Sequence, residues 1–175
     1  LKNIYNMTLD DFVKTNPEFI KYFDAVSLIG VLHHMPNPLE TLKIACSFLK
    51  SDGVMCLLDP NEFTPLQISA KRKLNKESWW VFPPEHINYF DFKAYEKLIN
   101  KVGLKTIVKM SAFPMEMFLL MGEDYIGNNV IGDKCHKKRI TFDLSIPDQV
   151  RRSIYHSLAD AGIGRDCIVY SKIKY

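Results

Sequence analysis

A strand–helix–strand pattern at residues 22–61 constrains the fold of this chain more than any other feature. Residues 25–29 form a short apolar run without polar alternation, which predicts a strand covered on both faces. Asn37 and Pro38 then match the N-cap and the first residue of a helix. A second apolar run at residues 54–58 predicts another buried strand. Two strands joined by a helix in this way are parallel and form a right-handed crossover.

The polar residues of this unit gather where its two strands end. In open parallel sheets, ligands bind at the carboxyl ends of the strands, which here are residues 30–35 and 59–62. A turn containing Ser, Asp and Gly at residues 51–53 is expected to stop the helix. Function should therefore be sought at the two strand ends. The helix presents an apolar face to the sheet, formed by Leu39, Leu42, Ala45, Phe48 and Leu49.

The remainder of the chain continues to alternate between helices and strands. Thr8, Thr64 and Asp91 are each expected to cap a helix that follows them. We predict one domain over residues 1–175, with a helical and loop insertion around residues 111–145. The remaining predicted elements are a strand end at 4–7, strands at 104–110 and 167–173, and a last helix after residue 147.

Composition is that of an ordinary soluble globular chain, with 47% apolar and 25% charged residues and a net charge of +3. This charge is too small to indicate a nucleic-acid partner, and the basic residues at 134–139 are typical of a solvated helix face. No apolar run approaches the roughly 20 residues of a membrane span, so no membrane partner is expected. The four cysteines lack CxxC spacing, and Cys46 and Cys56 lie in apolar patterns. This usage predicts a reduced, cytoplasmic protein.

The strand at residues 25–29 is apolar enough for the centre of a sheet, yet only one following strand naturally flanks it. An uncovered central strand leaves unpaired N–H and C=O groups on an apolar edge, which folded proteins avoid. Sequence upstream of Leu1, or another chain in a homodimer, is therefore expected to cover that side. We predict that residues 1–175 are the C-terminal part of a larger α/β domain.

Two segments resemble a known family. Residues 23–61, FDAVSLIGVLHHMPNPLETLKIACSFLKSDGVMCLLDPN, resemble the middle of class I S-adenosylmethionine-dependent methyltransferases. Residues 83–107, PPEHINYFDFKAYEKLINKVGLKTI, resemble the later H-x-x-x-F motif, helix and strand of that family. The resemblance implies a Rossmann-like methyltransferase fold with a mostly parallel sheet, one antiparallel strand and helices on both faces. In the family's strand order, 3-2-1-4-5-7-6, this chain would supply the end of strand three and strands four to seven.

The resemblance also implies S-adenosylmethionine as the cofactor. The family's Gly-rich cofactor loop is expected upstream, because none of the eight glycines here forms GxGxxG or GxGxG after a strand. Thr8, Leu9 and Asp10 align with the segment that contacts the adenine, although Thr8 stands where the family has an acid. The alternative for Thr8 is a plain helix cap.

Gly30, Val31 and His33 follow the central strand, where the methionine end of the cofactor should lie. Gly30 permits the backbone to approach a ligand closely. His33 and His34 can instead be a hydrogen-bonded loop pair, and the sequence leaves both interpretations open. Some relatives carry glutamates at the positions of Gly30 and His33 and bind Mg²⁺. This chain lacks both glutamates, which predicts that no metal is bound.

His86 is the best candidate for a general base, with His34 as a second catalytic residue. Methyl transfer is an in-line displacement at a cationic sulfonium, so the enzyme mainly supplies positioning and a dry pocket. A base helps when the acceptor hydroxyl or amine must lose a proton, and imidazole is suited to that near neutral pH. The alternative is that His86 only fixes its own loop through hydrogen bonds.

Asn61, Glu62, Trp80 and Tyr89 are expected to contact a small-molecule acceptor, because they follow a strand end or lie in an aromatic loop. The predicted function is methyl transfer from S-adenosylmethionine to a hydroxyl or amine of that acceptor. The alternative is a catalytically inactive methyltransferase-like module for binding or assembly. The aromatic and sulfur side chains that either line the acceptor pocket or only pack together are Trp79, Trp80, Phe82, Phe113, Met115, Met117, Phe118 and Tyr125.

Overall fold

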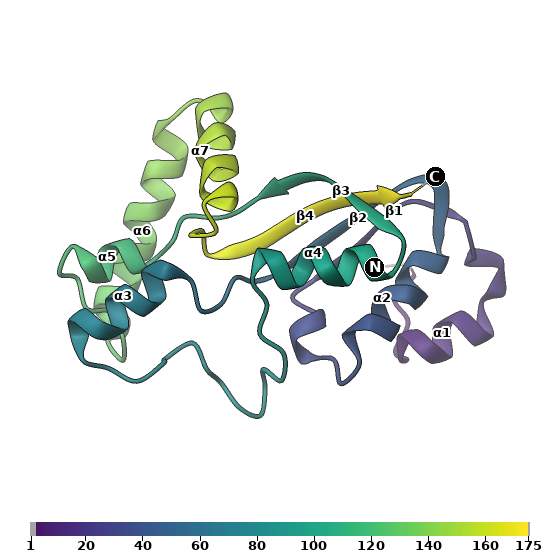
Figure 1. The fold of residues 1–175 in the computed structure, drawn as a ribbon, viewed down its shortest axis with the longest axis horizontal. Coiled ribbons are helices and arrows are strands. Elements are labelled where there is room, and N and C mark those ends of the chain that lie inside the picture. Colours follow the sequence, from purple (N-terminus) through teal and green to yellow (C-terminus); the bar gives the residue numbers. More distant parts are fainter. Residues whose placement is uncertain (1–2, 175) are drawn as a thin grey trace.

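The computed structural model describes residues 3–174, which form a four-stranded sheet surrounded by helices (Figure 1). No helix in this range is both long and apolar enough to cross a membrane. The strands are β1 (Phe23–Ile29), β2 (Leu49–Pro60), β3 (Leu104–Met110) and β4 (Asp166–Ile173). The α-helices are α1 (Leu9–Thr15), α2 (Pro38–Ser47), α3 (Pro65–Leu74), α4 (Phe92–Lys101), α5 (Glu116–Leu120), α6 (Asn129–Ser145) and α7 (Asp148–Asp160). The 3₁₀ turns are η1 (Pro17–Phe19) and η2 (Leu32–His34).

The strands are arranged in the order β1-β2-β4-β3. β1 and β2 are parallel, and β4 lies antiparallel between β2 and β3. This order confirms the predicted succession of strands four, five, seven and six with an antiparallel strand seven. β1, β2 and β3 share one direction, but only the β1–β2 pairing is parallel, because the antiparallel strand lies inside the sheet. The prediction of a mostly parallel sheet is therefore right for the directions of the strands, but two of the three strand pairings are antiparallel.

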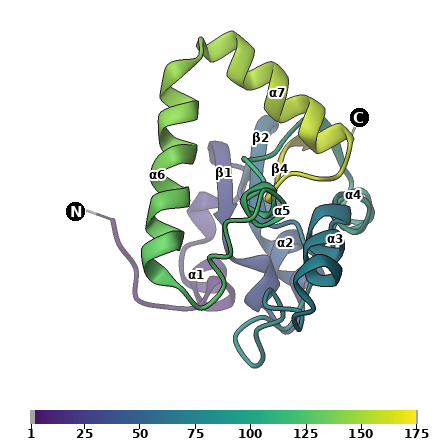
Figure 2. The ribbon, with the colours of Figure 1, turned by 90° about the vertical axis from the view of Figure 1, so that its left-hand side faces the viewer.

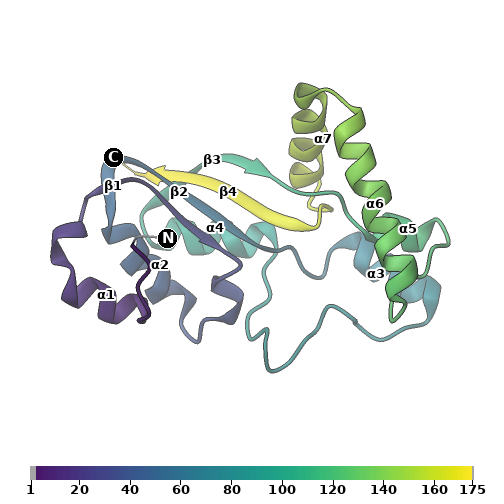
Figure 3. The same cartoon turned by 180° about the vertical axis from the view of Figure 1, so that it is seen from behind.

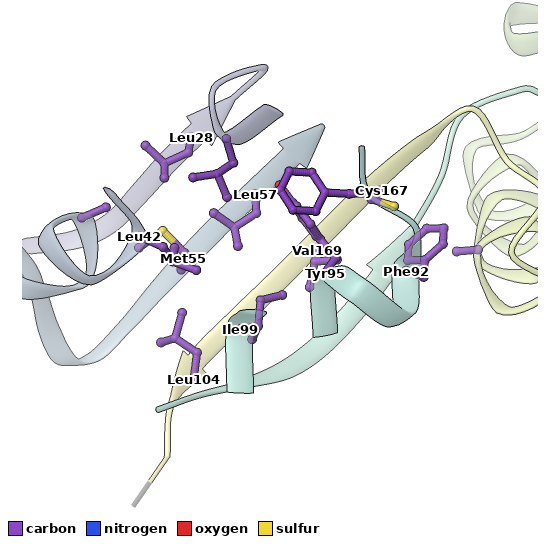
Figure 4. Close-up of a cluster of buried hydrophobic side chains, with 14 of the residues drawn as sticks. Leu28, Leu42, Met55, Leu57, Phe92, Tyr95, Ile99, Leu104, Cys167 and Val169 are labelled. Carbon is purple, nitrogen blue, oxygen red and sulfur yellow. The ribbon is translucent and has the colours of Figure 1, made fainter. Parts of the chain in front are cut away.

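One face of the sheet carries the main hydrophobic core. α2 and α4 pack on this face, where Leu42 and Tyr95 meet Met55, Leu57 and Val169 of the central strands (Figure 4). Alternate residues of β2 are buried, as expected for a strand with one face against a core. α7 packs against β3 from the opposite side of the sheet, as Figures 1 and 3 show. Helices thus lie on both faces, as predicted.

β1 is less covered than its sequence predicts. Of its seven residues only Leu28 is buried, and Ile29 is 54% exposed. β1 lies at the edge of the sheet and pairs with β2 alone. Residues 4–7, predicted as the end of a neighbouring strand, are exposed and form no strand. The prediction of a strand covered on both faces was wrong for this chain, because its helices cover β1 from one face only.

The junction between α2 and β2 also differs from the prediction. α2 ends at Ser47, because Leu49 is fully buried and already pairs with Phe23 of β1. The predicted turn at residues 51–53 is an irregularity within β2 and does not separate the helix from the strand. Gly53 suits this position, since a Cβ there would lie 3.1 Å from the carbonyl oxygen of Phe23 and 3.0 Å from a methyl carbon of Leu49.

Helix starts on both sides of the predicted site follow their capping residues. The side chains of Asn37 and Asp91 accept hydrogen bonds from the backbone N–H three residues further on, at 3.2 and 2.7 Å. Thr64 and Gln67 form a reciprocal capping box at the start of α3. The Asn37 and Asp91 caps fix the ends of the loops at residues 30–37 and 75–91, which carry the predicted catalytic histidines.

α5, α6 and α7 form a helical lobe at one end of the sheet, seen at the left of Figure 1 and from that end in Figure 2. α3 packs against α5 and joins the lobe to the sheet. α6 was predicted only as part of an insertion. It is polar on most of its surface, and its one buried residue, Cys135, packs with Met115 and Phe118 in a small second core.

Candidate active site

The parallel pairing of β1 and β2 brings their carboxyl ends together. Gly30 follows β1 with a left-handed φ of +63° and donates its N–H to the Leu58 carbonyl of β2 at 2.7 Å. A Cβ at Gly30 would lie 3.9 Å from Cε1 of His33, so the histidine ring lies beside this glycine. The predicted cofactor residues Gly30, Val31 and His33 are therefore next to the end of β2, as the topology requires.

A fully buried carboxylate links these strand ends to α4. Asp59, with 0% exposure, accepts hydrogen bonds from both the backbone N–H and the ring Nδ1 of His33. The hydroxyl of Tyr95 donates to its second oxygen. Burial and the Asp59 carboxylate raise the pKa of Tyr95, so this phenol remains a proton donor. Sequence reasoning placed Asp59 among the polar residues 59–62 at a strand end, but it did not predict the bonds of Asp59 to His33 and Tyr95.

Three histidines from two distant segments meet at this edge of the sheet. The ring centroids of His33 and His34 are 3.8 Å apart, and His86 lies 4.5 Å from the first and 5.2 Å from the second. Several bonds hold the loops together: His34 Nδ1 donates to the Glu85 carbonyl at 2.6 Å, Ile87 N–H donates to the His33 carbonyl at 3.1 Å, and Asn88 donates to carbonyls of the first loop. The histidine cluster, meaning His33, His34 and His86, thus unites two of the predicted catalytic residues with a predicted cofactor residue.

The surroundings of His86 lower its pKa. Removal from water lowers its pKa below the ordinary value of 6.5, and the neighbouring His33 and His34 lower it further. The imidazole of His86 is therefore neutral at pH 7 and offers a lone pair. A neutral imidazole can accept a proton or bind a metal ion.

His86 also lines a cavity of about 590 Å³ between the loop at residues 75–91 and the helical lobe. Trp79, Trp80, Phe82 and Tyr125 form its aromatic walls. Trp80 is only 7% exposed, and its indole Nε1 has no hydrogen-bond partner among the described residues. Part of the predicted aromatic group thus lines this cavity, which we name the acceptor pocket after the contacts predicted for it, whereas Phe113 and Phe118 pack in the second core.

Carboxyl groups dominate the charge of the acceptor pocket. Glu62 is 8% exposed, and burial together with Glu116 and Asp166 raises its pKa to about 7, although Gln67 donates to it at 2.8 Å. Burial likewise raises the pKa of Glu116 and of Asp166, and the Arg165 guanidinium opposes both shifts. Glu116 and Asp166 were not found from the sequence. The one local signal was an acid within the apolar run around Glu116.

Two predicted acceptor contacts have other partners. The side-chain amide of Asn61 donates to the carbonyls of Gly162 at 3.2 Å and Gly164 at 2.7 Å, and its Oδ1 has no partner among the described residues. Asn61 faces a neighbouring cavity of about 420 Å³, which it shares with Glu62. The hydroxyl of Tyr89 donates to the His86 carbonyl at 3.1 Å. The structure therefore gives both side chains a role in holding loops around the acceptor pocket.

The predicted adenine segment lies on a separate helix. Thr8 caps α1: its hydroxyl accepts from the Asp11 N–H at 3.1 Å and donates to the Asp11 carboxylate at 2.7 Å. Leu9 packs against the main core, and Asp10 is exposed in the first turn. The capping role of Thr8, one of the two predicted alternatives, is the one present in this chain.

Another hollow, of about 640 Å³, is lined by Lys134, Lys137 and Lys138 on the surface of α6. All of its lining residues belong to that one helix, and a single helix cannot enclose a ligand. The acceptor pocket beside the histidine cluster is the better candidate for an active site.

The fold and this edge of the sheet are those of an α/β enzyme of the Rossmann-like methyltransferase class. A family model described as methyltransferase domain matches residues 3–109, more than half of the 175 residues. The chain therefore belongs to the methyltransferase domain family. The class I S-adenosylmethionine-dependent methyltransferase family expected from the sequence is confirmed.

Solved structures agree with this fold. A SAM-dependent methyltransferase from Archaeoglobus fulgidus is similar with a TM-score of 0.57 and 15% identity over 97% of this chain and 67% of that chain. A Galdieria sulphuraria protein, provisionally described as a sarcosine dimethylglycine methyltransferase, gives a TM-score of 0.45 and 13% identity over 98% of this chain and 68% of that chain. A search of curated proteins found no match. At 15% identity, the likeness to the Archaeoglobus fulgidus structure shows a shared fold.

Proposed function

We propose that this domain transfers a methyl group from S-adenosylmethionine to a hydroxyl or amine of a small-molecule acceptor. The observation that carries the proposal is the meeting of the Gly30–His33 strand end with a pocket lined by His86 and Glu62. A donor at the strand end and an acceptor in the pocket would be held side by side. Holding the two reactants in this geometry accounts for most of the rate enhancement in methyl transfer.

The cofactor would bind along the strand end and α1. Gly30, Val31 and His33 would face its sulfonium and methionine end, with the left-handed Gly30 allowing close approach of the backbone. Thr8, Leu9 and Asp10 would face the adenine from the first turn of α1. Because the Thr8 hydroxyl is engaged with Asp11, an adenine contact there would come from backbone groups or from Asp10.

The acceptor would bind in the acceptor pocket against Trp80 and Glu62. The pocket is lined by the carboxyl groups of Glu62, Glu116 and Asp166. Among the described residues that line it, Arg165 is the single permanent cation. This balance disfavours acceptors that carry carboxylate or phosphate near the reacting atom. Neutral hydroxyl compounds and amines fit it, which agrees with the acceptor class predicted from the sequence.

His86 would take the proton that the acceptor loses, with His34 beside it. The lone pair of the acceptor oxygen or nitrogen attacks the methyl carbon, and the electron pair of the breaking S–C bond remains on sulfur. S-adenosylhomocysteine leaves, and the acceptor proton passes to the neutral imidazole of His86. The lowered pKa of His86 supports this role, since the ring is deprotonated at neutral pH.

The open edge of β1 supports a larger domain around this chain. β1 pairs on one side only, and Ile29 is 54% exposed. An upstream segment carrying the Gly-rich cofactor loop, or a second copy of the chain in a homodimer, would cover this edge. The four cysteines are free thiols, which supports a reducing compartment such as the cytoplasm.

A non-catalytic binding or assembly module is the second candidate. The observation that favours it is Thr8, which caps α1 where the family has an acid. Formation of S-adenosylhomocysteine in the presence of a panel of neutral, amine and anionic acceptors distinguishes the two functions. The proposed enzyme forms it with members of the first two groups. Absence of product with every acceptor, from protein that binds S-adenosylmethionine, would establish the binding module instead.

A further inference from the structure

We propose that His33, His34 and His86 together bind one divalent transition-metal ion of the zinc type beside the acceptor pocket. One nitrogen from each of the three rings lies within 4.8 Å of the other two. An ion at the centre of such a triangle is about 2.8 Å from each nitrogen, and zinc–imidazole bonds are about 2.0–2.1 Å long. Closure by less than about 1 Å per ring completes the site. His34 ends the short 3₁₀ turn η2 and His86 lies on a loop, and neither is fully buried, so their rings can make this movement.

The hydrogen bonds of two of these rings leave one nitrogen of each ring with a free lone pair. A carbonyl oxygen only accepts, so Nδ1 of His34 carries the hydrogen that it donates to Glu85 at 2.6 Å. Nδ1 of His33 likewise donates to Asp59, which already accepts the His33 N–H and the Tyr95 hydroxyl. In neutral His33 and His34 the remaining Nε2 atoms are therefore bare acceptors. Neighbouring lone pairs repel one another unless a cation lies between them.

The outer partners match those that support metal-bound histidines. Such a histidine usually donates its second ring N–H to a carboxylate or a backbone carbonyl, which fixes the ring and its tautomer. His33 donates to the Asp59 carboxylate and His34 to the Glu85 carbonyl. Asp59 is fully buried, and two of its partners, the backbone N–H of His33 and the hydroxyl of Tyr95, carry no charge. A divalent ion one imidazole away would compensate this buried negative charge.

The chemistry of the ligands selects the ion. Three imidazole nitrogens suit zinc, copper, nickel or cobalt, whereas magnesium and calcium prefer oxygen ligands. The sequence-based expectation of no metal rested on two missing glutamates, which are oxygen ligands. The histidine cluster supplies a different set, with three protein ligands and an open fourth position, as in catalytic zinc sites.

The use of the ion rests on the proposed function, whereas its binding does not. His86 lines the acceptor pocket, so the open position lies beside the acceptor. With the lone pair of His86 committed to the ion, the ion would acidify an acceptor hydroxyl beside it, and that hydroxyl would lose its proton to water. The oxygen then attacks the methyl carbon, and the S–C bond electrons stay on the sulfur of S-adenosylhomocysteine.

Cobalt titration tests the binding directly. Tag-free protein is stripped with a chelator and titrated with Co²⁺, whose four-coordinate complexes absorb visible light. We expect one Co²⁺ per chain, displaced by Zn²⁺. His34→Gln and His86→Gln should each weaken binding by more than about 100-fold, beyond the 10–100-fold effect of losing an outer partner. His156→Gln removes a histidine that bonds the Lys109 carbonyl on another element, and should bind as the wild type does.

Two outcomes overturn the proposal. One is a wild-type protein with no visible band at any Co²⁺ concentration. The other is a band retained in both His34→Gln and His86→Gln, with circular dichroism showing both variants folded. The catalytic use is read separately: chelator treatment should lower S-adenosylhomocysteine formation at least about tenfold, with recovery on adding Zn²⁺. An unchanged rate after stripping overturns that use. Absence of product under all conditions, with the cobalt band intact, contradicts the proposed function and leaves the metal site established.

Discussion

The two walls of the acceptor pocket differ in origin and in chemistry. One wall, from residues 60–86, lies within the segment matched by the methyltransferase family and carries His86 and the tryptophans. The opposite wall, from residues 115–166, lies outside that segment and carries Glu116, Arg165 and Asp166. We infer that the first wall holds the chemistry common to the family and that the second sets the charge of the acceptor. Function on a shared fold is determined by such added sites.

The walls also differ in how their carboxyl groups are held. Asp59, which directly precedes the first wall and does not itself line the pocket, is fully buried and accepts three hydrogen bonds. Asp166 on the second wall has a raised pKa because burial is opposed only by the Arg165 and Arg139 charges. A carboxylate with several donors is stabilised in its ionised form, whereas a buried one with few donors favours protonation. Substitution of Asp59 should therefore lower the stability of the folded protein. Substitutions on the second wall should change stability little but should change which acceptors bind.

The largest expected effect is on turnover, from His86→Ala on the first wall. Loss of a proton acceptor or metal ligand should reduce kcat by about 10²–10⁴-fold with a hydroxyl acceptor. Affinity for S-adenosylmethionine, measured by calorimetry, should stay within about twofold, because His86 lines the acceptor side. Turnover equal to that of the wild type would remove His86 from the chemistry.

Next is the stability of the two walls, compared through Asp59→Ala and Asp166→Ala. Asp59→Ala leaves the donors of His33 and Tyr95 unpaired in the core, which should lower the free energy of unfolding by about 3–5 kcal/mol. Asp166→Ala should change it by less than about 1 kcal/mol, since it removes a carboxyl group that burial disfavours. Urea denaturation measures both. Equal losses would show that the walls do not differ in this respect.

A smaller effect is the dependence of stability on pH through Glu62. The folded protein keeps the Glu62 proton up to a pKa of about 7, whereas the unfolded chain loses it near 4.5. Between these values the folded state binds more protons, so stability falls as pH rises and is lowest above pH 7. The fall should be about 1–2 kcal/mol, because the pocket is partly open to water. Glu62→Gln should abolish this part of the fall in denaturation measured at pH 5 and at pH 8.

The smallest effect concerns selectivity on the second wall. Asp166→Asn and Glu116→Gln should each raise KM for amine acceptors by about fivefold, since a bound ammonium group favours the ionised form of each carboxyl group and loses that partner, worth about 1 kcal/mol. KM for neutral hydroxyl acceptors should be unchanged, which serves as the internal control. An equal rise in KM for both acceptor types would mean that these side chains shape the pocket but do not distinguish acceptors by charge.

The first wall was largely predictable from sequence because local signals specify it. Asn37 and Asp91 cap their helices as expected, and the strand ends follow from the apolar runs they terminate. The carboxyl ends of parallel strands then bring the polar residues together. The histidine cluster follows from that topology, although the loop with His86 gave no regular pattern of its own.

The second wall was not predictable, because tertiary packing creates it. Glu116 lies in an apolar run, and Asp166 opens a strand far along the chain; neither has a neighbour in sequence that marks a site. α6 was missed as a long helix because it is polar on most sides and lacks an apolar stripe. The turn at residues 51–53 was misplaced because pairing of Leu49 with Phe23 extends β2 through it.

Calorimetric titration of the protein with S-adenosylmethionine tests the central claim most directly. The strand end around Gly30 should give saturable binding at one site per chain with a Kd below about 1 mM, and S-adenosylhomocysteine should compete for it. Gly30→Val, which places a β-branched side chain at a φ of +63°, should weaken this binding. Saturable heat in the wild type supports a methyl donor at this edge of the sheet. No heat up to about 1 mM would contradict it.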